Sequence, residues 1–549
     1  GLWFLDQLEP KSAFYNVAGA VRLRGALRLD ALEKSFQEVV SRHEILRTNF
    51  VEVDGKPIQK VRRQAPIHLG VVDLSEMSEP ERGLEASRLA NSEGARGFDL
   101  ARDELLRVMV IKLAGQEHVL SLTMHHIVTD RWSIRVLLRE LSRFYRAYLQ
   151  GDRPEPEELK IQYRDYVGWQ RRWLQGEEMN RQLEYWSDQL GDGEFGLEIP
   201  GDRVRPAVLS HRGGSMRIEL SQETSEQVRR RSRREGVTVY MTLLAALKVL
   251  LHRYTGQQDI TVGSPIANRR QKELEELIGL FANTVALRSR IQGEESFEQV
   301  LKRVRETSLG AYAHQDVPFE AVVERVQPQR DLSRTPLFQV MFAYENNAPE
   351  EMELEGIEAS RYEVKVETAR FDLTMYLEEG DEKIRGTIEY SADLFEERTV
   401  GRMIRHYETV LRAATSDPGE SVSRLPMMGP EELDLVLVEW NRTEREYGAE
   451  GCIHELFESQ VERSPDRIAL IFEDERVSYR ELNRRANQLA HYLRRRLVGP
   501  EVFVAICLKR SIEMVVGMLA VHKAGGAYVP IDPSYPRQRQ QFMLEDSRA

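Results

Sequence analysis

Cysteine is almost missing from this chain, which has two, Cys452 and Cys507, among 549 residues. Two cysteines cannot build a disulfide framework, and their spacing matches no metal-ligand pattern. The sequence also lacks a signal-peptide pattern and any run of about 18 apolar residues, which a membrane span requires. We therefore expect a soluble, cytoplasmic protein without a metal site. The chain opens inside a patterned segment and without a start methionine, so we expect a fragment cut at both ends.

An excess of positive charge is missing as well. Lysine and arginine number 77 against 89 aspartate and glutamate residues, which gives a formal net charge of -12. A general nucleic-acid binder should be basic overall or carry a basic stripe, so we expect no nucleic-acid partner. The one dense basic run, residues 229–234, has helical spacing and is predicted to be a solvated helix face.

The chain does contain enough apolar residues for packed cores, because 41% of its residues are hydrophobic and 30% charged. At about 150 residues per domain, three or four compact units are expected. A strand pattern at 119–128 is followed by a helical pattern at 134–148, and Asp30 is placed to cap an earlier helix. This alternation predicts a mixed α/β fold. Breaks in the pattern divide the chain into predicted blocks at 1–175, 176–425 and 450–549, with a linker at 426–449.

The strongest chemical signal is the segment MHHIVTDRWS at residues 124–133. Strand alternation places His126 on the apolar, inward face, at the end of the strand. A histidine in a dry site can accept or relay a proton, and Asp130 can orient that site or hold the loop. Free N–H groups of the following helix could stabilise an oxyanion. From spacing alone, a structural histidine pair is the more common explanation. A zinc site is conceivable, but no third ligand lies at suitable spacing.

This segment resembles the HHxxxDG signature of condensation domains of non-ribosomal peptide synthetases. Five further segments resemble motifs of the same family and follow in the family's order. They are RHEILRT at 42–48, YRDYVGW at 163–169, IGLFANT at 278–284 with Arg288, HQDVPFE at 314–320 and RDLSRTPL at 330–337. Chance agreement of six ordered motifs is not a serious competitor.

The resemblance implies a fold of two chloramphenicol-acetyltransferase-like lobes that form a V-shaped pseudo-dimer, residues 1–175 and 176–425, with a tunnel between them. It also implies the reaction. An acceptor amine attacks a donor thioester, and the peptide moves onto the acceptor. Both substrates are tethered to phosphopantetheine on carrier domains, so the expected partners are an upstream donor and a downstream acceptor carrier, and no cofactor is bound directly.

The same resemblance implies roles for single residues. His126 is the catalytic histidine, as a general base or by orienting the amine, while His125 and Asp130 support it. Asp130 is expected to pair with Arg288 and hold the loop. Two further positions match residues that line the family's active-site region, although an ion-paired, supporting role is the more common one for such an arginine: Arg47 and Asn346.

One position departs from the signature, because Arg131 stands where the family has glycine. Glycine permits close backbone approach, whereas arginine adds a long cation beside His126. Three interpretations follow. The side chain swings into solvent, it gates the tunnel or contacts the substrate, or it blocks the tunnel and leaves a domain that only docks carrier proteins.

Relatives with other activities fit less well. Heterocyclisation domains replace the histidine pair with aspartates, and epimerisation domains differ in the later motifs. The opening segment, residues 2–25, resembles the subtype that accepts an L-configured donor; the initiating subtype with a fatty acyl donor stays possible. Two alternatives of other classes remain. One is a catalytically silent carrier-docking or recruitment domain, and the other a free-standing acyltransferase that uses coenzyme A.

The last block resembles the start of an adenylation domain in two segments, VSYRELNRRANQLA at 477–490 and HKAGGAYVPIDP at 522–533. This adjacent domain argues against the coenzyme A alternative, since it marks an assembly line. The phosphate loop, the amino-acid-selecting residues and the catalytic lysine of that family would come later. We therefore expect an incomplete and inactive adenylation region. Ser215 follows two glycines but lacks the context of a carrier attachment site and is predicted to begin a strand.

Overall fold

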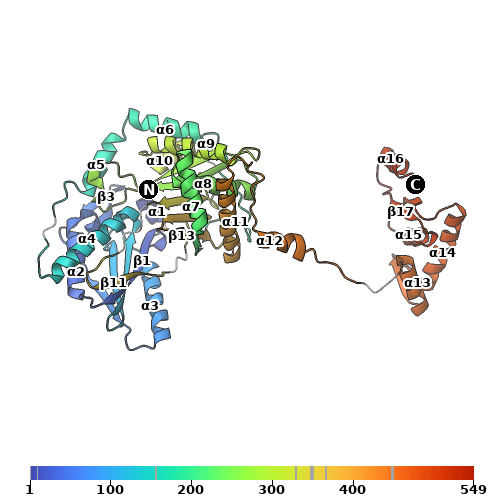
Figure 1. The fold of residues 1–549 in the computed structure, drawn as a ribbon, viewed down its shortest axis with the longest axis horizontal. Coiled ribbons are helices and arrows are strands. Elements are labelled where there is room, and N and C mark those ends of the chain that lie inside the picture. Colours follow the sequence, from blue (N-terminus) through green and yellow to red (C-terminus); the bar gives the residue numbers. More distant parts are fainter. Residues whose placement is uncertain are drawn as a thin grey trace. The chain divides into compact units, whose positions relative to one another are not determined.

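The computed structural model describes residues 2–8, 10–154, 157–327, 331–346, 352–364, 368–446 and 451–549. The chain divides into two compact units, Gly1–Glu439 and Trp440–Ala549, and each is described by itself. Both units mix helices and strands, so the predicted mixed α/β class is confirmed (Figure 1). The predicted lobe boundary at residue 175 stays a prediction.

A five-stranded sheet organises the first lobe of the larger unit. Its strands, in spatial order, are β11 (Ile357–Tyr362), β1 (Asn16–Gly25), β6 (Glu117–His125), β5 (Leu106–Ala114) and β4 (Leu69–Asp73). Four of them come from the first 125 residues, but β11 arrives from the second half of the chain and pairs antiparallel with β1. The lobe is therefore not a continuous stretch of sequence.

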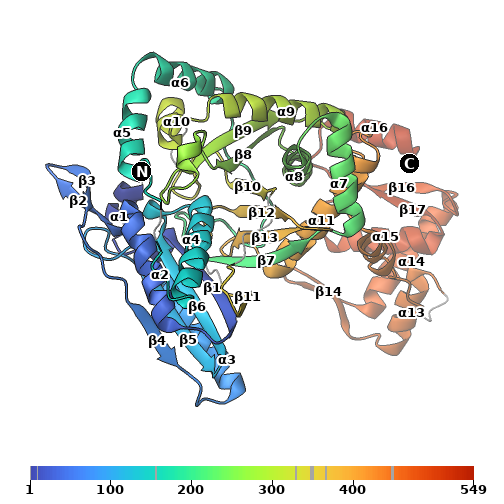
Figure 2. The same ribbon diagram turned by 60° about the vertical axis from the view of Figure 1, so that its left-hand side comes forward.

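Helices cover both faces of this sheet (Figure 2). Two of them, α2 (Leu29–Arg42) and α4 (Arg131–Leu149), bury Phe36 and Leu137 against Leu120 of β6. On the opposite face, α3 (Glu79–Gly94) places Ala86 in a smaller cluster with Val119. Neighbouring residues of β6 thus face opposite layers, which is the alternation expected of a buried strand. A hairpin of β2 (Thr48–Val53) and β3 (Lys56–Val61) stands beside the sheet.

A six-stranded sheet organises the second lobe. Its order is β7 (Gly213–Glu219), β13 (Ile384–Ser391), β12 (Leu373–Glu379), β10 (Val340–Glu345), β8 (Asp259–Ile266) and β9 (Asn283–Arg290). Ser215 was predicted to begin a strand; it lies within β7, which begins two residues earlier, at Gly213. One face is covered by α7 (Gln222–Glu235), α8 (Val239–Thr255), α9 (Phe297–Ala313) and α11 (Glu397–Ser416).

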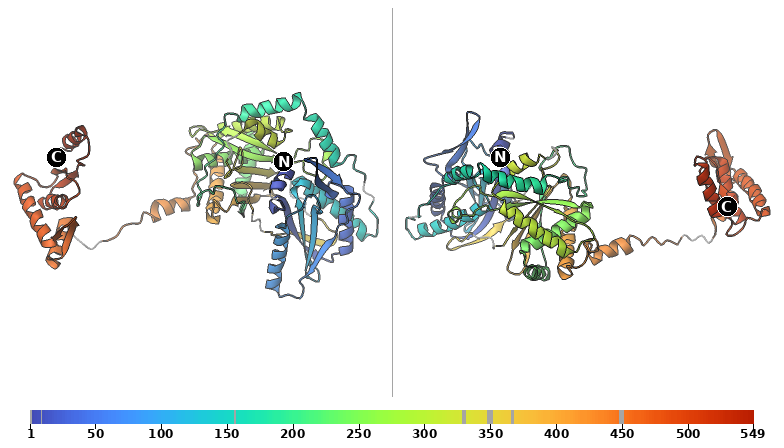
Figure 3. Two further views of the ribbon diagram at one scale, coloured as in Figure 1. Left: turned by 180° about the vertical axis from the view of Figure 1, so that it is seen from behind. Right: turned by 90° about the horizontal axis from the view of Figure 1, so that it is seen from above.

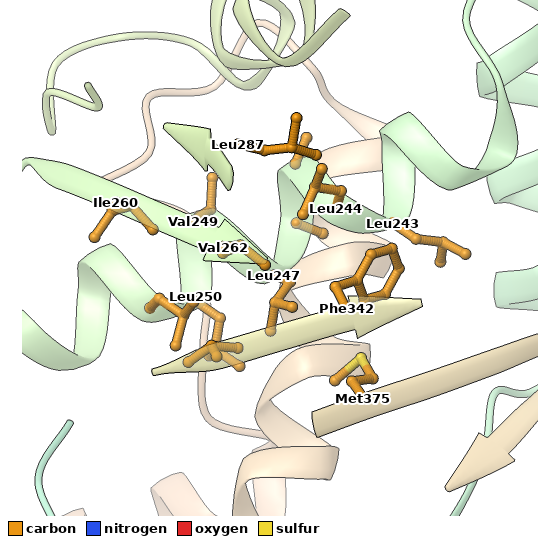
Figure 4. Close-up of a cluster of buried hydrophobic side chains, with 14 of the residues drawn as sticks. Leu243, Leu244, Leu247, Val249, Leu250, Ile260, Val262, Leu287, Phe342 and Met375 are labelled. Carbon is orange, nitrogen blue, oxygen red and sulfur yellow. The ribbon is translucent and has the colours of Figure 1, made fainter. Parts of the chain in front are cut away.

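The core of this lobe centres on α8, which is apolar on nearly all sides because other helices flank it and the sheet lies beneath it. Its Leu244 and Leu247 pack with Val262 of β8 and Phe342 of β10 (Figure 4). Within the described part of the chain, no single helix is long and apolar enough to cross a membrane. Taken together, α7 and α8 have the length and composition of a membrane span, but the two helices are bent by 108° relative to each other.

Two helices connect the lobes, α5 (Tyr163–Trp173) and α6 (Glu177–Leu190), the teal segments of Figure 3. Tyr166 of α5 packs on Phe281, in the segment that leads into β9. Gln182 of α6 accepts hydrogen bonds from the backbone of Asp316 and Val317, just before α10 (Phe319–Val326). A short helix, α12 (Pro430–Asp434), follows α11 near the end of this unit.

The second unit is small. Its helices are α13 (Ile453–Arg463), α14 (Tyr479–Arg495), α15 (Ile512–Ala524) and α16 (Arg537–Ser547). Its strands form two pairs, β14 (Ile468–Phe472) with β15 (Glu475–Ser478), and β16 (Phe503–Ile506) with β17 (Ala527–Pro530). The residues Val477, Leu482 and Ile512 form its core, while Ile471, Phe503 and Phe542 are exposed.

Candidate active site

His126 lies directly after β6 and begins a short 3₁₀ helix, His126–Val128. The strand ends at His125, so the alternation used in the sequence prediction does not set the direction of the His126 side chain. A hydrogen bond sets it instead, because Nδ1 lies 2.6 Å from the carbonyl oxygen of Thr129. A carbonyl only accepts, so Nδ1 carries the proton and Nε2 keeps a free lone pair in the neutral ring.

The surroundings of His126 favour that neutral form. Desolvation lowers the pKa of His126, and the positive charge of Arg370 lowers it further. The residue as a whole is half-buried. A neutral histidine with a fixed tautomer is suited to accept a proton from an attacking nucleophile.

His125 has different surroundings, because its side chain is fully buried. Its Nδ1 accepts a hydrogen bond of 3.1 Å from the backbone N–H of Ile127 and thereby caps the 3₁₀ helix. The rings of Tyr15 and Phe98 lie 6.3 and 6.1 Å away. Burial, with smaller contributions from His126 and Arg370, lowers the pKa of His125 to about 4. These contacts suit a residue that shapes the turn.

The pKa of His125 makes stability depend on pH. Between about pH 6.5 and about pH 4 the unfolded chain takes up a proton at His125 and the folded chain does not. The free energy of unfolding should therefore fall by about 2–3 kcal/mol as the pH decreases through this window. Urea unfolding of the larger unit at several pH values measures this. His125→Asn keeps an acceptor for Ile127 and does not titrate, so its pH slope should be shallower. The exposed His68→Asn is the matched control, and an equal slope in all three proteins would contradict the assignment.

Asp130 ties the start of α4 to the second lobe. As the N-cap of α4 it accepts hydrogen bonds from the backbone N–H and the hydroxyl of Ser133, at 2.8 and 2.7 Å. Its other oxygen accepts from the backbone N–H groups of Phe281 and Ala282, at 3.0 and 3.2 Å. The guanidinium of Arg269 lies 3.1 Å from the carboxylate, with only 1% of its side chain exposed. Asp130 is thus a buried joint between the lobes.

The expected pairing of Asp130 with Arg288 is wrong. Arg288 lies on β9, six residues beyond Ala282, and at about 3.3 Å per strand residue this is roughly 20 Å from the Asp130 loop. Its guanidinium instead binds Asp259, at 2.6 Å, and Asp192. The partner of Asp130, Arg269, was missed by the sequence analysis. The available signal was an arginine pair at residues 269–270, shortly after the strand run that ends at Ile266.

Several of the motif segments meet around this joint. The hydroxyl of Tyr163 donates to the Leu280 carbonyl at 2.8 Å, and its ring lies so close to Gly279 that no side chain would fit there. His43, from the first motif, binds Glu140 of α4 at 2.9 Å. The side-chain amide of Asn283 donates to the carbonyl oxygens of Gln315 and Val317, in the HQDVPFE segment. Segments far apart in sequence thus form one network.

The RDLSRTPL segment lies elsewhere in the second lobe. Arg330 falls outside the described residues. Arg334 donates to the carbonyl oxygen of Leu197 at 3.1 Å, and Leu337 is buried in the core of that lobe. This segment therefore stabilises the lobe and does not belong to the network around Asp130.

The two positions expected to line the active site differ in their surroundings. Arg47 is half-buried, donates to the Arg62 carbonyl at 2.6 Å and lies 3.7 Å from Glu44. These contacts are those of a supporting residue. Asn346 is exposed and directly follows β10.

Arg131 occupies the first position of α4, next to Asp130. Its side chain is 54% exposed, but it does not point freely into solvent. It forms an ion pair with Glu345, at the end of β10, and lies 3.6 Å from Glu378 of β12. Both partners belong to the sheet of the second lobe, so Arg131 spans the two lobes.

A second arginine, Arg370, approaches the histidines from the other lobe and was not found by the sequence analysis. Its guanidinium lies 4.9 Å from the ring centroid of Tyr15 and donates to the Phe14 carbonyl at 3.3 Å. Because no local pattern marks residue 370, its approach to the first lobe is a feature of the tertiary fold. Nearby, burial raises the pKa of Tyr376 to about 12 and raises that of Glu389.

Among the described residues, no group of three or more histidine, cysteine, aspartate or glutamate side chains is arranged to hold a metal ion. The charged groups that act on the imidazole of His126 are Arg370, which lowers its pKa, and the buried Asp130, which raises it. Such a site fits proton transfer at an acyl centre.

Comparison with known proteins identifies the class. Residues 1–437 match the model of the condensation domain family, and residues 457–549 match the model of AMP-binding enzymes. The chain therefore belongs to the condensation-domain family of non-ribosomal peptide synthetases and ends in a partial AMP-binding, or adenylation, region. The family inferred from the motifs is confirmed.

Known relatives are much longer than this chain. One of the linear gramicidin synthase proteins of Brevibacillus parabrevis is 44% identical over 550 residues, which cover 100% of this chain and 11% of that protein. Malpinin synthetase of Mortierella alpina is 41% identical over 545 residues, which cover 99% of this chain and 7% of that protein. The chain thus spans about a tenth of the length of these relatives.

Solved structures confirm the fold. A four-domain non-ribosomal peptide synthetase bound to AMP and glycine has a TM-score of 0.86 at 23% identity, covering 100% of this chain and 42% of that one. The X-domain from teicoplanin biosynthesis has a TM-score of 0.71 at 32% identity, and the match covers 78% of this chain and 95% of that one.

Proposed function

We propose that residues 1–437 catalyse amide bond formation in non-ribosomal peptide biosynthesis. The observation that carries the proposal is His126, a neutral imidazole whose Nδ1 is held by the Thr129 carbonyl and whose Nε2 forms no hydrogen bond with the described residues. In the proposed step, the acceptor amine attacks the thioester carbonyl of the donor while Nε2 accepts or orients an amine proton. The C–S bond then breaks, and the proton leaves with the thiol of the donor arm.

Both substrates reach the site on phosphopantetheine arms of carrier domains, so the domain itself needs no bound cofactor. His126 is the catalytic residue in this proposal. His125, Asp130 and Arg47 are positioning residues, and Arg288 stabilises the second lobe. Residues 457–549 contribute the first part of an adenylation domain, and we expect no adenylate formation by this region.

The donor is proposed to have the L configuration, because the opening segment, residues 2–25, resembles that subtype. The initiating subtype predicts a fatty acyl donor instead. Offering L-aminoacyl, D-aminoacyl and fatty acyl donors in one competition separates these possibilities, since the preferred donor appears in the product.

A condensation assay tests the proposed function. Donor and acceptor carrier proteins, loaded with several aminoacyl pairs, are mixed with the chain, and the acceptor carrier is weighed by intact-protein mass spectrometry. We expect a mass increase equal to the donor acyl group. An acceptor whose amine is acetylated is the control and should gain no mass. Absence of product with every pair would overturn the proposal.

A second candidate function is carrier docking or recruitment without catalysis. The observation that favours it is the likeness to the teicoplanin X-domain, which was also solved in a complex with OxyB. This candidate predicts binding of loaded carriers with no product. Measuring carrier binding by calorimetry beside the condensation assay distinguishes the two functions.

A further inference from the structure

Arg131 makes a connection between the lobes that differs from the buried one beside it. Its guanidinium extends from the first residue of α4 to Glu345 and Glu378, which lie at the ends of two neighbouring strands of the second lobe. In the parallel pair of β10 and β12 these two glutamates stand opposite each other in register. The view of Figure 2 places the start of α4 beside the end of β12.

The two glutamates need a positive partner. Like charges directly opposite each other on adjacent strands repel, and these side chains are only 22% and 16% exposed. Glu378 also binds Arg385 of β13, at 3.1 Å. Glu345 lies on β10, which β12 separates from β13, and Arg131 supplies its ion pair. The charge of Arg131 therefore matters to the acidic pair even though the arginine is partly solvated.

The two connections at the start of α4 differ in strength. Asp130 is buried and saturated with hydrogen bonds, so the joint that it forms should stay intact. The ion pairs of Arg131 are half-exposed, and such pairs are weak and screened by salt. One connection is thus permanent, while the adjacent one can break and re-form without disturbing the fold.

We propose that Arg131, Glu345 and Glu378 form an electrostatic latch that closes the lobes over the His126 side and opens when a tethered acceptor enters. This inference rests on the proposed function for its kinetic consequence, but the latch itself is a property of the resting protein. Arg131 is a positioning residue here, because it acts on access to His126 and not on the reacting atoms. The glycine of the family signature would leave the two carboxylates without this partner.

Distance measurements test the latch without any substrate. Spin labels are placed on exposed positions of α3 and α7, one in each lobe, after replacing Cys452 and Cys507 by serine. We expect a narrow distance distribution for the wild type that broadens in Arg131→Ala and in the double variant Glu345→Gln/Glu378→Gln. Arg139→Ala removes another exposed arginine from α4 and is the matched control. High salt should broaden the wild-type distribution and leave Arg131→Ala unchanged.

Kinetics test the consequence. Opening the latch should lower KM for the acceptor carrier by about two- to fivefold, the range expected for a half-exposed ion pair, with kcat little changed. Arg131→Lys keeps the charge and should retain part of the effect. Exchanging the charges, as Arg131→Glu/Glu345→Arg, should restore the wild-type distance distribution and KM.

The inference would be overturned if Arg131→Ala and the double glutamine variant both gave the distance distribution of Arg139→Ala. An equal fall of kcat in Arg131→Ala and Arg131→Lys, at constant KM, would also contradict the inference, since it would mean that Arg131 acts on the reacting atoms. If the wild type forms no amide, the proposed function fails. The distance distributions still decide the latch in that case.

Discussion

Replacing His126 by alanine should lower the rate of amide formation by about 10²–10⁴-fold, the usual contribution of a general base. The free Nε2 is the group that would accept the amine proton, and no backbone atom can substitute for it. The loss should appear in kcat with saturating carriers, because the substitution removes the group that accepts the proton and leaves the protein surface unchanged. Initial rates are read from the mass increase of the acceptor carrier.

The pH profile provides an independent check on the same residue. The pKa of His126 is lowered from its usual 6.5 by burial and by Arg370, so the neutral form persists below that pH. With a base of this kind, activity is present above the folded pKa and is lost as the pH falls through it. Arg370→Gln removes a positive charge, so it should move the acid limb to higher pH.

The matched control for both experiments is His68→Ala, which replaces an exposed histidine of the same lobe and should leave the rate and the pH profile unchanged. A loss of rate below about threefold in His126→Ala would remove His126 from the mechanism.

Local features near the site could be predicted from the sequence. The apolar spacing at residues 134–148 indicated a helix, and α4 indeed begins at Arg131 with Asp130 as its N-cap. An aspartate before a run of helical spacing is a local signal, and its hydrogen bond to the Ser133 N–H is local as well. Asp30 was predicted to cap a helix by the same logic and does not. That helix begins at Leu29 with Arg28 as its N-cap, so Asp30 is its second residue. The carboxylate of Asp30 binds Arg28 instead.

The long-range contacts could not be predicted in the same way. The partner of Asp130 is Arg269, 139 residues away. The arginine pair at residues 269–270 is a local signal, but it does not tell which distant carboxylate either arginine meets. Arg370 reaches the histidines because the segment before β12 returns to the first lobe. The pairing of β11 with β1 has the same origin, since its register joins Tyr362 to Ala20. Family resemblance supplied the residue types, but which arginine meets which carboxylate depends on how the chain crosses between lobes.

Replacing Asp130 by alanine should lower the free energy of unfolding of the larger unit by about 3–5 kcal/mol. The loss has two sources. Arg269 would keep its charge with 1% of its side chain exposed, and the N–H groups of Phe281 and Ala282 would lose their acceptor. An unpaired buried charge costs more than the ion pair itself contributes. Calorimetry or urea unfolding measures the change, with the exposed Asp188→Ala on α6 as a control that should have little effect.

A second substitution separates structural from chemical roles of Asp130. In Asp130→Ala/Arg269→Met both charges are gone, so the double variant should regain much of the free energy of unfolding that Asp130→Ala loses. If its loss instead equalled the sum of the losses of the two single variants, the two residues would not be coupled. If Asp130 acts only as the joint, amide formation should recover with stability in this double variant, because the Thr129 carbonyl still holds His126. A double variant that is stable yet has the low rate of His126→Ala would mean that the carboxylate acts on the imidazole during the reaction. The structure argues for the first result, since both oxygens of Asp130 are engaged by Ser133, Arg269 and the segment before β9.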